Sequence, residues 1–230
     1  ISNLQVHLPS MCYNAVSATK AKIKYLKHRT DDPAYIAELE KQLELFLASH
    51  APLYDVSGFA HPPLMVFTNL EPLRPQAFTW GLIPHWVKDK KTADIVQNQT
   101  LNAKAETIFE KPSFKIPAMQ QRCVLYIDAF YEHHFANKMN IPFHISMKDG
   151  SPMAFAGLWD QWQNPLTGEV LSTVTMVTCP ANSLLRKIHK KEKDVEARMP
   201  VILLREDQDT WLQVIEKTDD LVQLKSLLNP

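Results

Sequence analysis

The sequence of 230 residues has few cysteines and no net charge, and each of these two features argues against a class of protein. The three cysteines are an odd number without a CxxC pair, so a disulfide framework or a zinc knuckle explains them poorly. Reduced thiols in a cytoplasm fit them best. The 25 basic side chains balance the 25 acidic ones, which disfavours a strongly basic nucleic-acid protein but allows a local basic patch.

Long apolar runs are also missing. No stretch reaches the length of a transmembrane helix, and Ile1–Ser10 lacks the charged start and apolar core of a signal peptide. A hydrophobic content of 45% and a charged content of 22% are typical of soluble globular proteins, so we expect no membrane partner. The length suits one sizeable domain, and the chain has no repeat, low-complexity tract or clear linker.

Hydrophobic spacing predicts helices near both ends of the chain and strands between them. The predicted helices are Ala18–His28, Asp32–Pro52, Ala181–Lys190, Asp207–Glu216 and Thr218–Leu228, with a short helix or loop over Trp86–Gln99. The predicted strands are Leu64–Thr68, Ala77–Ile83, Cys123–Phe130, Ile141–Met147, Met153–Trp159, Thr173–Thr178 and Met199–Leu204. This order predicts a single α+β domain with an antiparallel or mixed, barrel-like sheet flanked by helices.

The Met11-Cys12 pair carries an unusual chemical possibility. If the chain began at Cys12, that residue would hold a thiol and a free α-amine on neighbouring carbons, and such a 1,2-aminothiol reacts with aldehydes. With Ile1–Ser10 attached, the nitrogen of Cys12 is a peptide nitrogen. We therefore expect residues 1–10 to be a misassigned start, a cloning remnant or a removable leader, and residues 11–230 to form the domain. After Met11 is also removed, the active protein would begin at Cys12.

Five dense blocks follow in order: Trp80–Trp86, Asn102–Thr107, Arg122–Glu132, Gly157–Trp159 and Arg198–Leu203. Together with Met11-Cys12 they resemble the SOS response-associated peptidase (SRAP) family over nearly the whole chain after residue 10. The resemblance implies a protein that recognises an abasic (AP) site in single-stranded DNA and forms a covalent thiazolidine crosslink with it, protecting the site during the DNA damage response. It implies a lyase-like, crosslinking enzyme in a family named as a peptidase, a class of hydrolase.

We expect a monomer without cofactor or metal, located in the cytoplasm and associated with the nucleoid during DNA damage. The family's catalytic residues match Cys12, Asn102 and Glu132 here. The catalytic histidine departs from the family pattern, because many members read His-x-Arg-Met-Pro and this chain has Glu196 at that place. We predict that His189, nine residues before Arg198 (198 − 189 = 9), takes the role, with Glu196 as the rival.

The predicted DNA contacts form a separate set: Lys104, Trp86, Pro62, Arg198, Arg186 and Lys187. Lys104 stands where many members have arginine, which keeps the charge but loses the bidentate fork. Trp86 and Pro62 are predicted to stack on or wedge between bases, and the basic residues to neutralise phosphates. Without a resemblance, each would be interpreted as a solvated or packed side chain.

Two other functions stay open from the sequence. One is a cysteine peptidase that uses Cys12, His189 and Glu132, acting either on other proteins or only on its own leader. The other is a single-stranded DNA-binding module without activity, which Lys104, the displaced histidine and His133 in place of the usual tryptophan would fit. Cys123 and Cys179 lie in strand patterns and are predicted to be buried and inert.

Overall fold

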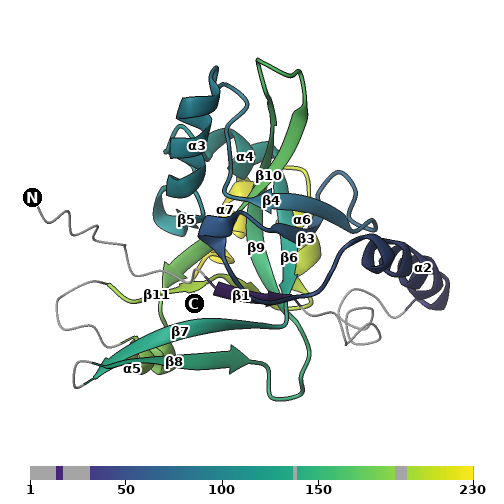
Figure 1. The fold of residues 1–230 in the computed structure, drawn as a ribbon. Helices are drawn as coiled ribbons and strands as arrows, with labels where there is room; N and C mark the ends of the chain where they lie inside the picture. Colours follow the sequence, from purple (N-terminus) through teal and green to yellow (C-terminus); the bar gives the residue numbers. More distant parts are fainter. Residues whose placement is uncertain (1–13, 18–31, 137–138, 190–195, 230) are drawn as a thin grey trace, which may run out of the picture.

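The computed structural model of the chain describes residues 14–17, 32–136, 139–189 and 196–229 (Figure 1). Its strands are β1 (Asn14–Ser17), β2 (Leu53–Ser57), β3 (Pro63–Thr68), β4 (Gln76–Trp80), β5 (Asn102–Lys104), β6 (Arg122–Ile127), β7 (Ala129–Ala136), β8 (Met139–Ser146), β9 (Met153–Gln163), β10 (Val170–Pro180), β11 (Arg198–Pro200) and β12 (Ile202–Leu203). Its helices are α2 (Pro33–Ser49), α3 (Lys90–Gln99), α4 (Lys115–Gln120), α5 (Ser183–Ile188), α6 (Asp207–Leu212) and α7 (Thr218–Ser226), with short 3-10 helices η1 (Gly58–Ala60) and η2 (Ala105–Thr107).

A closed ring of strands forms the centre of the molecule. Its order is β10, β4, β3, β6 and β9, and β9 pairs again with β10. The β4–β10 pairing is parallel and the others are antiparallel, so the barrel is mixed. Strands β5, β11 and β12 extend it at the ends of β10 and β9. The predicted single α+β domain with a barrel-like sheet is confirmed.

A second sheet lies beside the barrel, in the order β2, β1, β7 and β8 (Figure 1). Phe130 of β7 ties this sheet to the barrel, because its ring is buried and meets the ring of Phe155 on β9 at 5.8 Å between centroids. Further along β7 the strand leaves the core, and β8 is the outer edge of the sheet. We call β7, β8, α5 and His189 the arm. The arm carries part of the candidate site.

Local sequence explains where the helices begin. The carboxylate of Asp32 accepts a hydrogen bond from the backbone of Ala34 at 2.9 Å, and Pro33 occupies the first turn of α2. Asp89 caps α3 in the same way, and the side chain of Asn182 caps α5 by accepting from the backbone of Leu185 at 3.0 Å. The helix predicted from Asp32 is confirmed and ends three residues before Pro52. The helix predicted over Ala18–His28 lies outside the described residues.

Some predicted strands have different limits in the structure. The apolar run Cys123–Phe130 is two strands, because the chain bends at Asp128 and passes from the barrel into the second sheet. Glu132 therefore lies within β7 and not at the end of a strand. The strand predicted to reach Ile83 stops at Trp80, since Gly81 has a φ of 105°, a conformation that other residues rarely adopt. The strand predicted over Met199–Leu204 is divided between β11 and β12.

One buried cation joins the helices to the barrel. The Arg122 side chain on β6 is fully buried and donates hydrogen bonds to four backbone carbonyls: Ala118, Met119, Trp211 and Gln213. These carbonyls lie at the ends of α4 and α6, where a positive charge is favourable. Burial lowers the pKa of this guanidinium to about 10, which leaves it charged at neutral pH. No helix among the described residues is long and apolar enough to cross a membrane.

Candidate functional site

A buried carboxylate and a buried histidine meet between β7 and α5. The Nδ1 atom of His189 lies 2.7 Å from Oε1 of Glu132, and the two side chains are only 2% and 6% exposed. The same oxygen accepts a hydrogen bond from the backbone of His133 at 3.0 Å. An ionised carboxylate can only accept hydrogen bonds, so Nδ1 of His189 is the donor of this bond when Glu132 is charged.

The other ring nitrogen of His189 is not used by any residue that the structure describes. Its Nε2 atom is buried and has no hydrogen-bond partner among the described residues. When Nδ1 carries the proton of a neutral imidazole, Nε2 is an acceptor that can receive a proton. A histidine oriented through one nitrogen by a carboxylate and free at the other is the arrangement that acid–base chemistry requires.

The local fold explains why these two side chains meet. His189 is the residue that ends α5, and its backbone N–H donates to the carbonyl of Leu185 at 2.8 Å. Leu185 is buried, which holds α5 against the protein. One residue earlier, the carbonyl of Ile188 accepts a hydrogen bond from Nδ1 of His134 at 2.7 Å. His134 stands two residues after Glu132 on β7, so helix and strand are fixed to each other at two successive positions.

The rival for the histidine role lies elsewhere. The carboxylate of Glu196 is 62% exposed and pairs with Nη1 of Arg198 at 3.2 Å. Arg198 itself is 4% exposed and forms a two-pronged pair with Glu106, at 2.9 and 2.7 Å. It also donates to the carbonyl of Thr178 at 2.7 Å. The structure thus brings His189 to Glu132 and Glu196 to Arg198.

The Glu106–Arg198 pair affects the ionisation of Glu106. Burial disfavours the charged carboxylate, but the hydrogen bonds from Arg198 and from its own backbone outweigh burial and hold the pKa of Glu106 below its ordinary value. Lys104 adds a smaller attraction in the same direction. Arg198 is therefore committed to partners inside the protein, and a contact from it to a phosphate would have to compete with them.

The predicted Asn102 and Lys104 lie together on β5, next to the end of β10. Asn102 is buried opposite Met176, whereas Lys104, opposite Thr178, is exposed. From Thr178 the chain continues through Pro180 into α5 and His189. A single stretch of chain thus links the neighbourhood of β5 with the histidine of the arm.

Trp86 is the exposed aromatic residue among the predicted DNA contacts, with 44% of its side chain accessible. The turn before it is anchored by Asp160 on β9, whose Oδ2 accepts from the backbone of His85 at 3.0 Å and lies 2.9 Å from Nδ1 of the same residue. The Asp160 side chain is only 3% exposed. This anchorage holds the backbone at the residue before Trp86.

The remaining predicted contacts differ in exposure. Arg186 and Lys187 are exposed on α5, as phosphate ligands need to be. Pro62 is buried, so its wedging role stays a prediction that requires the surrounding chain to move. Cys12 lies outside the described residues. The two other cysteines are free and buried as predicted, and burial raises the pKa of the Cys123 thiol and brings that of Cys179 to about 11.

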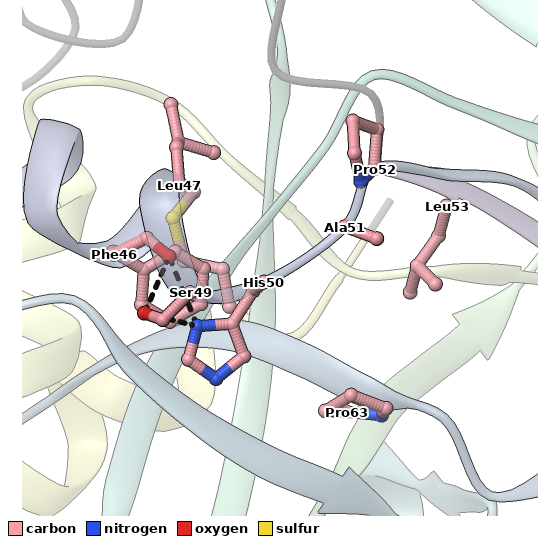
Figure 2. A pocket seen from close by; sticks show the side chains of 9 residues that line it. Phe46, Leu47, Ser49, His50, Ala51, Pro52, Leu53 and Pro63 are labelled. Atoms are coloured by element: carbon pink, nitrogen blue, oxygen red, sulfur yellow. Dashed lines mark hydrogen bonds between the residues drawn. The ribbon is translucent and has the colours of Figure 1, made fainter.

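Two pockets lie apart from the Glu132–His189 pair. Figure 2 shows the first, about 230 Å³ in volume, at the end of α2, where the rings of Phe46 and His50 stack at 4.2 Å. No residue that we predicted for catalysis or DNA binding is among the described residues lining it. The second, about 320 Å³, is lined by Glu106, Phe109 and Lys225 among others and borders the pair with Arg198.

Sequence reasoning missed two features of the arm. The first is His134, whose bond to α5 no spacing rule predicts. The second is an exposed apolar row on β8: Met139, Ile141 and Phe143. Their alternation is visible in the sequence, but alternation alone does not tell an exposed edge from a buried face.

Comparison with known proteins gives a consistent result. Residues 15–230 match the family model described as SOS response associated peptidase (SRAP). The abasic site processing protein YoqW of Bacillus subtilis is 41% identical over 152 residues, which is 66% of this chain and 62% of that protein. The abasic site processing protein HMCES of Pongo abelii is 32% identical over 161 residues, covering 58% of this chain and 43% of that protein. The match therefore spans less than two thirds of these relatives.

Solved structures agree with this result. A crystal structure of a Bacteroides thetaiotaomicron protein is 32% identical with a TM-score of 0.78, covering 96% of this chain and 87% of that one. A Bordetella bronchiseptica protein is 26% identical with a TM-score of 0.73, and the match covers 95% of this chain and 94% of that one. The family model matches nearly the whole chain, and the solved structures share its fold. The chain belongs to the SRAP family.

Proposed function

We propose that this protein recognises abasic sites in single-stranded DNA and crosslinks to them through Cys12. The observation that carries the proposal is the buried contact between Glu132 and His189, with Nε2 of the histidine left for a ligand. Relatives named as abasic site processing proteins support the choice of substrate. The active form begins at Cys12, because only then does that residue have a free amine.

The first described residue after Cys12 lies beside the strand of this pair. Asn14 on β1 pairs with Tyr131 on β7, the neighbour of Glu132. Cys12 precedes Asn14 by two residues in the sequence, which supports its assignment to this site.

The chemistry is a condensation that balances without a cofactor. The ring-opened sugar of an abasic site has an aldehyde, and the α-amine of Cys12 adds to its carbon. The aldehyde oxygen leaves as water, taking one proton from the amine and one from the thiol. The thiol sulfur then closes a five-membered thiazolidine ring. Closure is intramolecular and gains from high effective molarity.

Each site residue has a separate role in the proposed reaction. Glu132 moves the proton between the amine and the departing oxygen. Nε2 of His189 takes up the proton of the anomeric hydroxyl and gives it to the sugar ring oxygen as the ring opens. Asn102 orients the amine and the sugar. Lys104, Arg186 and Lys187 bind phosphates, and Trp86 stacks on a base.

Denaturing electrophoresis tests the proposal directly. A labelled single strand with one abasic site is incubated with protein beginning at Cys12, and a shifted band that survives heating in detergent is expected. A matched Cys12→Ser variant keeps the amine but lacks the thiol, so it should give a band only after borohydride reduction of its imine. Protein that retains Ile1 should give none. Equal crosslinking by protein that retains Ile1 would show that the free amine is not the nucleophile.

A further inference from the structure

We infer that the outer part of the arm is a subsite for a base of the DNA strand, next to the abasic sugar. The row Met139, Ile141 and Phe143 forms its platform, with exposed fractions of 57%, 39% and 39%. This inference rests on the proposed function, since it names where the strand runs once its sugar is at Glu132. Family resemblance and the sequence alone did not indicate this surface.

The register of the arm places the platform beside the Glu132–His189 pair. Phe143 stands directly opposite Glu132, and Ile141 directly opposite His134. Opposite residues of an antiparallel pair lie on the same face of the sheet. The contact between the rings of His134 and Phe143, at 6.0 Å between centroids, agrees with this placement. The row therefore begins at the catalytic carboxylate and leads outward along the edge strand.

On the face of the sheet that holds Glu132, side chains become more exposed from the barrel towards the outer end of the arm. Phe130, opposite Ile145, is 1% exposed, and Glu132 in the next position of the face is 4% exposed. Phe143 and Ile141 then emerge from the protein surface. Apolar side chains exposed in a contiguous row beside a functional site mark a surface that a ligand covers.

The charges on the arm favour a polyanion as that ligand. Strand β8 contains no Asp, Glu, Lys or Arg, and the one charged residue of β7 is the buried Glu132. The charged residues of α5 are both cations, Arg186 and Lys187, and both are exposed. Helix α5 lies beside β7, where the carbonyl of Ile188 accepts the hydrogen bond from His134 (Figure 1). Aromatic and apolar side chains next to cations are the combination that binds single-stranded nucleic acid without reading its sequence.

The test measures how the crosslinking rate depends on the DNA concentration, using protein that begins at Cys12. The double variant Phe143→Ala, Ile141→Ser should raise the half-saturating concentration about 10-fold and leave the limiting rate unchanged. The control Leu166→Ser removes an 83% exposed leucine in the turn after β9 and should change neither quantity. Thermal unfolding verifies that each variant is folded.

A second strand identifies the ligand as a base. Its nucleotides next to the abasic site are replaced by spacers that keep the phosphates and lack bases. Wild-type protein should lose affinity for this strand by the same factor, and the double variant should lose nothing further. Equal half-saturating concentrations for wild type and double variant on the normal strand would overturn the subsite while leaving the proposed function intact. A dimer that the double variant dissociates would also overturn it, since the row would then bind another copy.

If wild-type protein forms no crosslink at all, the proposed function fails, and fluorescence anisotropy with the two strands still tests the subsite. The normal strand should bind more tightly than the spacer strand, and the double variant should abolish the difference. Equal binding of both strands by wild-type protein would contradict the inference.

Discussion

The barrel and the arm both contain buried ionisable side chains, but they use them differently. In the barrel, Arg122 donates to four backbone carbonyls and joins two helix ends to β6. In the arm, Glu132 and His189 bind each other, and Nε2 of the histidine has no partner among the described residues. The first arrangement uses a charge to hold the fold, whereas the second keeps a polar atom for a ligand.

The largest effect should come from removing the proton-carrying group of the arm. Glu132→Gln keeps the size of the side chain and an oxygen that can accept from His189, but it cannot take up a proton. We expect the crosslinking rate to fall by a factor on the order of 10²–10⁴ while the fold is retained. Single-turnover crosslinking measures the rate, and thermal unfolding shows whether the fold persists. A rate within twofold of wild type would remove Glu132 from the mechanism.

In the barrel, the corresponding change should affect stability. Arg122→Met leaves several buried carbonyls without donors, so we expect the free energy of unfolding to fall by about 3–5 kcal/mol. The control Arg74→Met removes an exposed pair with Glu71, and its expected loss is about 0–1 kcal/mol. Urea denaturation compares the two. Equal losses would mean that burial of Arg122 has no energetic consequence.

The pair of Glu106 and Arg198 lies at the end of the barrel, where β11 pairs with β10, and should respond to pH. The pKa of Glu106 is lower in the folded protein than its ordinary value of 4.5, so the folded state favours the carboxylate. Its contribution to stability is present above that ordinary value and is lost as the pH falls through the lowered pKa. The variant Glu106→Gln should lack this pH-dependent contribution to the free energy of unfolding. Unfolding followed from pH 6 to pH 3 compares the variant with wild type, and identical pH profiles would contradict the assignment.

The smallest expected effect concerns the reactivity of the cysteine thiols. Burial raises the pKa of Cys123 and brings that of Cys179 to about 11, so both stay protonated and shielded at pH 8. In native protein beginning at Cys12, a thiol reagent should label Cys12 alone, and all three cysteines after denaturation. Mass spectrometry of labelled peptides locates the modified residues. Rapid native labelling of Cys123 would show that the barrel opens.

The sequence by itself determined the motifs that resemble the SRAP family and the residue types at the candidate site. It also determined those helices and strands that are specified by residues close together in the chain. The start of α2 is one example, because Asp32 caps a backbone group only two residues away. The caps of α3 and α5 follow the same rule. Such contacts are encoded in short stretches of sequence and need no knowledge of the rest of the chain.

Only the tertiary structure decided how these parts meet. The bend at Asp128 divides one apolar run between two sheets, because the first half pairs with β3 and β9 and the second half with β1 and β8. The contact between Glu132 and His189 joins residues 57 positions apart. The burial of Arg198, an expected phosphate ligand, depends on Glu106, 92 positions away. Hydrophobic periodicity is local and non-directional, so it can predict a buried face but not which residue covers it.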